Sequence, residues 1–117
     1  MYAHYSAYVI GINRLHLSAH FKQESNESLI HADTVRSAIV KLGGIAITDR
    51  DQTKIIHSTS YKEMLEQALQ TETGAAKTYG ELLKLIEVSG DRELYDSIEA
   101  IYFAEVRSVE EMRMMMA

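Results

Sequence analysis

The sequence contains no cysteine, no proline and no tryptophan among its 117 residues. The absence of cysteine excludes disulfides, thiolate zinc sites and thiol nucleophiles, and it is typical of proteins from a reducing compartment. The absence of proline means that no residue type present forbids a long, unbroken helix. We therefore expect a cytoplasmic protein that is built from long helices.

Basic residues and long apolar runs are also scarce. The chain has 12 Lys and Arg against 17 Asp and Glu, a net charge of −5, so it lacks the clustered cations that phosphate contacts need. No apolar run approaches the roughly 20 residues of a membrane span, and the first residues lack the basic and apolar pattern of a signal peptide. With 46% hydrophobic residues, the composition is that of a globular protein. We expect one soluble domain over residues 1–117, with neither nucleic acid nor membrane as a partner.

Apolar residues recur at steps of three and four through most of the chain, which is the period of a helix. This pattern predicts long helices over about 13–42, 60–87 and 92–112. Residues 2–12 are also expected to be helical, either as a short helix that turns near Gly11 or as the start of a helix that runs on towards Phe21. Residues 44–59 lose the period and form a connection that is long enough to run the length of a bundle. The predicted fold is all-α, an antiparallel four-helix bundle with a short first helix and a long crossover between helices 2 and 3.

Local signals mark where the long helices begin and end. The Gly43-Gly44 pair predicts the end of the second helix. Ser60 and Glu63 match the capping box Ser-x-x-Glu at the start of the third. Asp91 is expected to be the N-cap of the last helix.

Charged residues interrupt the apolar faces of the third and fourth helices. Glu72 lies between Leu69 and Ala76, and Glu105 comes four residues after Ile101, on faces that should be buried. Isolated buried carboxylates cost several kcal/mol and are tolerated when they are paired or bind a cation. Glu72 and Glu105 are therefore candidate metal ligands.

Polar residues occupy the corresponding face of the second helix, where Glu24, Ser28 and His31 interrupt the apolar pattern. Glu27 precedes His31 by four residues, so one helical turn brings their side chains together. Carboxylate oxygen together with imidazole nitrogen suits iron, manganese or zinc. His31, with Glu27 or Glu24, completes the candidate metal-ligating set.

Each of these residues also has a simpler explanation. A glutamate on a helix face often lies at the edge with its head group in solvent, and a single helical histidine is more often structural than a ligand. The remaining histidines have no partner at ligand spacing within a clear apolar face, so we expect structural or surface roles for them: His4, His16, His20 and His57. Six tyrosines are expected to be packing residues with solvated hydroxyls, with a redox or electron-relay role for one of them as the alternative: Tyr2, Tyr5, Tyr8, Tyr79, Tyr95 and Tyr102.

Three segments resemble ferritin-like proteins, and bacterioferritins especially. The stretch from Glu24 to Asp33 (ESNESLIHAD), which runs on to the Leu-Gly-Gly stop at 42–44, resembles the second helix of that family. Residues 63–77 are similar to its third helix, which carries a central glutamate ligand, and residues 98–105 are similar to its fourth. The resemblance implies metal-ligating roles for His31, Glu72 and Glu105, with Glu27 or Glu24 as a substitute ligand. It implies iron as the metal, held as a di-iron pair in the family.

The sequence departs from the family pattern at several ligand positions. Ser28 stands where the Glu-x-x-His motif of the second helix has its glutamate, and Ser108 stands where the fourth helix has its histidine. The position of the first-helix glutamate falls before Met1, or nearest His4 if the first helix is continuous. Leu29 and Ile30 replace the methionine that binds haem in bacterioferritins, so no haem is expected.

Two functions follow from these observations. The resemblance implies an iron-binding protein that takes part in iron oxidation, storage or detoxification as a homo-oligomer. Its ferroxidase reaction, the oxidation of Fe(II) by dioxygen or peroxide, would make it an oxidoreductase. The serines at ligand positions favour the alternative, a metal-free helical bundle that serves as a structural or assembly module.

Overall fold

The computed structural model describes all residues 1–117 and contains four helices and no strand. The helices are α1 (Tyr2–Tyr8), α2 (Arg14–Lys41), α3 (Tyr61–Ser89) and α4 (Arg92–Met116). These bounds confirm the predicted all-α class, the short first helix and the long connection before α3. No helix combines the length and the apolarity needed to cross a bilayer.

The chain divides into two compact units, which we describe separately: Met1–Met64 and Leu65–Ala117. The first unit holds α1, α2, the long connection and the start of α3, and the second holds the rest of α3 with α4. Whether these two units form the single domain predicted over residues 1–117 depends on how they pack together, so the single domain stays a prediction.

Aromatic packing joins α1 to α2 in the first unit. The rings of Tyr2 and Tyr5 each lie 6.0 Å, centroid to centroid, from the ring of Phe21. These three side chains are buried. Next to them, the hydroxyl of Ser6 donates to the carbonyl of Ser18, and the hydroxyl of Ser18 donates to the carbonyl of Ser6. The short helix α1 is thus anchored on the N-terminal part of α2.

Glycines end the helices where the sequence predicts it. Gly43 has a φ of 81°, which favours glycine, and Gly44 N–H donates to the carbonyl of Ile39 at 2.9 Å. Gly90, with a φ of 76°, ends α3 in the same conformational region. Asp91 then accepts a hydrogen bond from the amide of Leu94 at 3.0 Å, as expected for the N-cap of α4.

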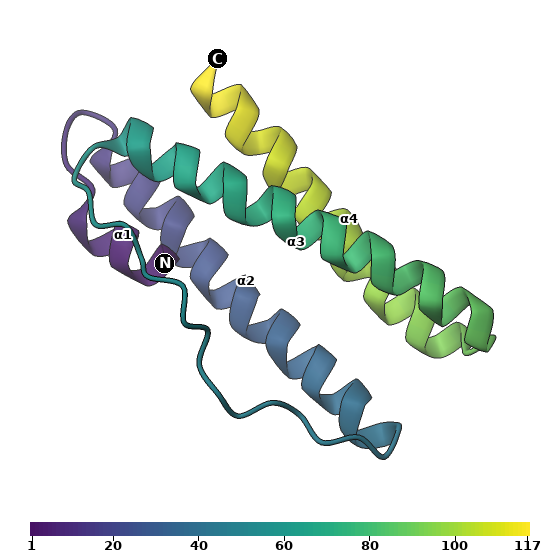
Figure 1. Ribbon diagram of the computed structural model, residues 1–117. Coiled ribbons are helices and arrows are strands. Elements are labelled where there is room, and N and C mark those ends of the chain that lie inside the picture. Colours follow the sequence, from purple (N-terminus) through teal and green to yellow (C-terminus); the bar gives the residue numbers. More distant parts are fainter. The chain divides into compact units, whose positions relative to one another are not determined.

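The long connection, residues 42–60, runs back from the end of α2 to α1 (Figure 1). It has no regular secondary structure, and its isoleucines Ile45 and Ile47 are exposed. Its last part is held by α1, because the hydroxyl of Tyr5 donates to the carbonyl of Ile56 at 2.8 Å. At the start of α3 the hydroxyl of Ser58 donates to the carboxylate of Glu63.

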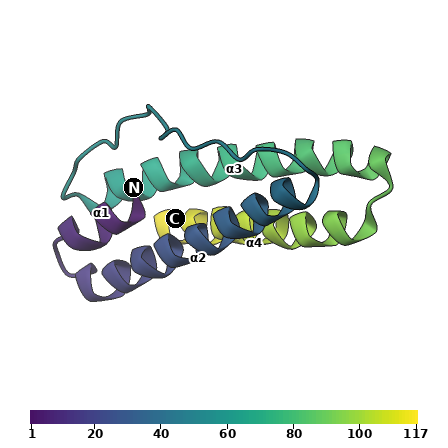
Figure 2. The ribbon, with the colours of Figure 1, turned by 90° about the horizontal axis from the view of Figure 1, so that it is seen from below.

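In the second unit, α3 and α4 lie side by side and antiparallel, joined by the tight turn at Gly90 (Figures 1 and 2). The buried apolar side chains of this unit recur at helical spacing on both helices: Leu65, Ala68, Leu83, Ile86, Ile98, Ile101, Val109 and Met112. The same buried face includes Glu72 and Glu105, the candidate ligands predicted from the sequence.

Candidate metal-binding site

Two buried carboxylates lie within the apolar face of the second unit. Glu72 on α3 is 4% exposed and Glu105 on α4 is 9% exposed. Their predicted burial is confirmed, and the alternative in which their head groups lie in solvent is wrong. Burying two like charges is unfavourable unless hydrogen bonds, protons or a cation compensate them, so these two side chains are the strongest candidates for a functional site.

Tyr79 is influenced by the charges of both carboxylates. It follows Glu72 by seven residues, which is about two helical turns and returns it to the same face of α3. Burial raises the pKa of the Tyr79 hydroxyl, and the negative charges of Glu105 and Glu72 raise it further. The phenol therefore keeps its proton at neutral pH and is available as a hydrogen-bond donor.

The sequence favours a packing role with a solvated hydroxyl for Tyr79, with a redox role as the alternative, and it does not place Tyr79 with the carboxylates. The seven-residue spacing from Glu72 was the signal that could have placed it with the carboxylates. Ser108, at the position where the family resemblance expects a histidine, is also buried on α4, three residues after Glu105. A serine hydroxyl is a much weaker metal ligand than an imidazole, so this position contributes no strong donor.

The candidate ligands of α2 belong to the first unit. His31 Nε2 lies 3.6 Å from the Glu27 carboxylate, which confirms the predicted pairing across one helical turn. Glu24 lies 4.0 Å from His20 Nε2, a pair at the same spacing that the sequence reading missed. The hydroxyl of Ser28 donates to the main-chain carbonyl of Glu24 at 2.9 Å, so it serves the helix backbone.

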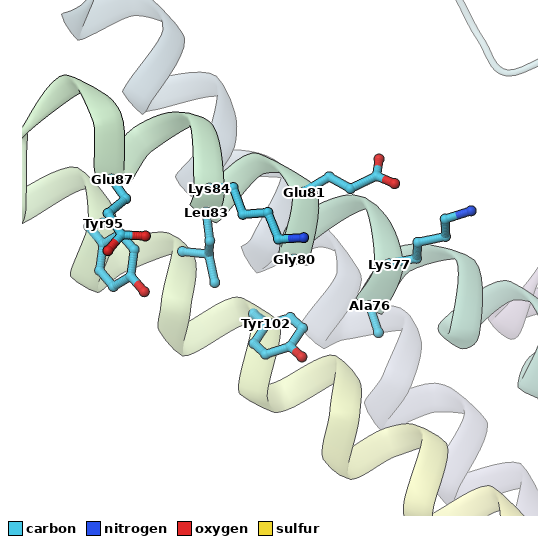
Figure 3. Close-up of a pocket in the computed structure, with 9 residues that line it drawn as sticks. All are labelled: Ala76, Lys77, Gly80, Glu81, Leu83, Lys84, Glu87, Tyr95 and Tyr102. Atoms are coloured by element: carbon cyan, nitrogen blue, oxygen red, sulfur yellow. The ribbon is translucent and has the colours of Figure 1, made fainter.

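The second unit also contains a pocket of about 580 Å³ that is lined by residues of α3 and α4 (Figure 3). Tyr95 and Tyr102 come from α4, and Lys77 and Lys84 come from α3. Neither Glu72 nor Glu105 lines this pocket. The pocket is therefore separate from the carboxylate pair.

No group of three or more histidine, aspartate or glutamate side chains is arranged to hold a metal ion. A di-iron centre in a bundle of this type uses four glutamates and two histidines. The carboxylates of Glu72 and Glu105 suit a hard cation whose other ligands are water, but they do not amount to such a complete set. The roles of His31, Glu27 and Glu24 as ligands stay predictions.

Comparison with known proteins decides the family. The ferritin-like domain matches residues 1–117, the full length of the sequence. The chain belongs to the ferritin-like family. No curated protein matches the sequence.

A solved structure agrees with this assignment. The fold superposes with a TM-score of 0.91 on a crystal structure of ferritin-like, diiron-carboxylate proteins from Bacillus anthracis str. Ames, at 28% sequence identity. The alignment covers 99% of this ferritin-like chain and 82% of the Bacillus chain. The predicted ferritin-like four-helix bundle is therefore confirmed, whereas the special likeness to bacterioferritins stays a prediction.

Proposed function

We propose that this ferritin-like protein binds Fe(II) as its substrate at Glu72 and Glu105 and takes part in iron oxidation, storage or detoxification. The observation that carries the proposal is the burial of these two carboxylates, whose charges add to the effect of burial in raising the pKa of Tyr79. The likeness to a structure described as diiron-carboxylate supports it. Carboxylate oxygens are ligands that suit iron and manganese, with zinc as a further candidate.

The chemistry of the pair follows from burial and charge. Fe(II) between the two carboxylates would offset their mutual repulsion, and it would retain water at its remaining positions. Electrons pass from Fe(II) to dioxygen or peroxide when the ion is oxidised. The Tyr79 hydroxyl, which is protonated at neutral pH as phenols ordinarily are, would donate a hydrogen bond to a carboxylate or to bound water.

The resemblance supplies the rest of the proposed set. His31 would be the nitrogen ligand, and Glu27 or Glu24 would be a further carboxylate. The proposal includes a homo-oligomer in a cytoplasmic setting, and exposed apolar residues of α2 such as Leu29, Ile30 and Val40 support self-association.

A second candidate function is a metal-free structural or assembly module of the same fold. Ser108 supports it, because this buried serine takes the place of a histidine ligand. The hydrogen bond from Ser28 to the Glu24 carbonyl supports it as well.

Iron retention separates the two candidates. Purified protein is loaded anaerobically with Fe(II), desalted, assayed for iron and native mass, and then exposed to air while the near-ultraviolet ferric absorbance is followed. We expect the wild type to retain stoichiometric iron. We expect Glu72→Gln and Glu105→Gln each to bind iron at least about tenfold more weakly, since loss of a group that only orients a ligand already costs about 10–100-fold.

Matched variants keep this experiment specific. Glu66→Gln on α3 and Glu110→Gln on α4 remove exposed carboxylates from the same helices and should retain iron as the wild type does. His31→Gln tests the proposed nitrogen ligand, with the exposed His16→Gln as its control. Wild-type protein that retains no iron would overturn the proposed iron site and favour the metal-free alternative.

A further inference from the structure

An imidazole pair joins α1 to the end of the long connection, outside the carboxylate site. His4 Nε2 lies 2.9 Å from His57 Nδ1, although 53 residues separate them in the sequence. The sequence shows no partner at ligand spacing for either histidine, and the structure supplies one from a distant part of the chain. One ring donates its N–H to the lone pair of the other, so the nitrogen-bearing edges of the two rings face each other.

Neighbouring side chains hold both rings in place. The ring of Tyr8 lies 4.5 Å from the ring of His4 and 4.8 Å from that of His57, measured between centroids. The hydroxyl of Tyr5 fixes the carbonyl of Ile56, the residue before His57, at 2.8 Å. The pair is therefore preorganised by contacts on both sides, which lowers the cost of ordering it around a ligand.

The separation of the two nitrogens matches the spacing of neighbouring ligands on one metal ion. Two imidazole nitrogens at about 2.0–2.1 Å from a metal lie about 2.9 Å apart when they subtend a right angle, and about 3.3 Å apart at the tetrahedral angle. A right angle is the angle between neighbouring ligands in square-planar and octahedral complexes, and among the divalent first-row ions Cu(II) binds nitrogen ligands most tightly.

We propose that His4 and His57 form a two-histidine site for a divalent transition metal ion, with Cu(II) the preferred ion. His4 ligates through Nε2 and His57 through Nδ1. The hydrogen that the two rings share moves to the other nitrogen of its ring, so ligation requires a change of tautomer and no net loss of a proton. Water fills the remaining positions, because the contact is exposed and no third protein ligand is arranged there.

Such a site would lock the connection to α1. Residues 42–60 have no regular secondary structure, and the His4–His57 contact lies close to where they rejoin a helix. An ion bound by both rings replaces a single hydrogen bond with two metal–nitrogen bonds. Binding therefore lowers the population in which this segment is open, by a factor of about one plus the ratio of the free metal concentration to Kd.

The test uses the full chain with one equivalent of Cu(II) and three variants. Pulsed electron paramagnetic resonance counts the coordinated imidazoles, and competition with glycine gives the affinity. We expect two imidazoles in the wild type and in the exposed control His16→Gln. In His4→Gln and His57→Gln we expect one imidazole or none and an affinity at least about tenfold lower, as loss of a ligand requires.

Hydrogen exchange measured by mass spectrometry gives the position of the ion. Cu(II) should slow exchange in peptides that cover residues 2–8 and 55–60 of the wild type, and it should have no such effect in His4→Gln or His57→Gln. Glutamine retains a polar side chain that can bond to the remaining imidazole, so we expect both variants to fold. The wild-type imidazole count tests the site without any variant.

Two results would overturn the proposal. One is a wild-type spectrum with fewer than two imidazoles, and the other is an affinity and exchange pattern that neither substitution changes. Both results are independent of iron binding, because Glu72 and Glu105 are intact throughout.

Discussion

Helices α2 and α4 have similar lengths, 28 and 25 residues, but they are stabilised in different ways. Buried residues of α4 are spread from Ile98 to Met112, whereas the buried residues of α2 are Leu17 and Phe21, both near its start. The charged groups differ as well, since the α2 carboxylates Glu24 and Glu27 pair with histidines of their own helix and Glu105 of α4 is buried among apolar residues. In this single chain, buried side chains stabilise α4 along most of its length, whereas they stabilise α2 only near its start.

Truncating one apolar side chain on each helix gives the largest expected contrast. Ile98 is 1% exposed, so Ile98→Ala should lower the free energy of unfolding by about 2–5 kcal/mol through lost burial and a cavity. Leu29 is 65% exposed, so Leu29→Ala should change the free energy of unfolding of the single chain by less than about 0.5 kcal/mol. Urea unfolding of both variants provides the measurement. A large loss in Leu29→Ala would show that this face of α2 is covered in the assembled protein.

The N-caps of the two helices offer a smaller contrast. Asp91 accepts a hydrogen bond from the amide of Leu94, so Asp91→Ala should destabilise the protein by about 1 kcal/mol. Asn13, at the N-cap of α2, makes no side-chain capping bond, and Asn13→Ala should have an effect near zero. Thermal unfolding compares the two variants, and equal shifts in Tm would contradict the assignment of the caps.

The smallest contrast concerns two tyrosines, one in each unit. Burial is the main cause that raises the pKa of both Tyr5 and Tyr79 above the ordinary value of 10.0; Glu63 adds to it for Tyr5, and Glu105 and Glu72 add to it for Tyr79. Because the folded state holds these protons more tightly, their contribution to stability is complete below pH 10 and is lost as the pH rises through the raised values.

Removing one carboxylate charge at a time should change the pKa values of these two tyrosines independently. Glu105→Gln should lower the pKa of Tyr79 and leave the pKa of Tyr5 unchanged. Glu63→Gln should lower the pKa of Tyr5 and leave the pKa of Tyr79 unchanged. Tyrosinate absorbance measured during alkaline titration follows both groups. A pKa of Tyr79 that does not respond to Glu105→Gln would show that the carboxylate charge does not reach the phenol.

Local signals in the sequence were sufficient for the fold and for part of the site. Helix period, the glycines at 43 and 90 and the cap at Asp91 act over a few residues, so their physical effects can be read directly. Glu72 and Glu105 were found because a charge within an apolar face is conspicuous. The contact between His4 and His57 has no such signal, since only the path of the connection brings these two residues together.

The exposed connection also bears on solubility. Ile45 and Ile47 are 95% and 82% exposed, and they lie in a segment without strand pairing and without proline. Extended β-branched segments of this kind act as templates for intermolecular strand addition. The charged residues Asp49, Arg50 and Asp51 follow after Thr48 and oppose such stacking. They would therefore protect this exposed segment against aggregation.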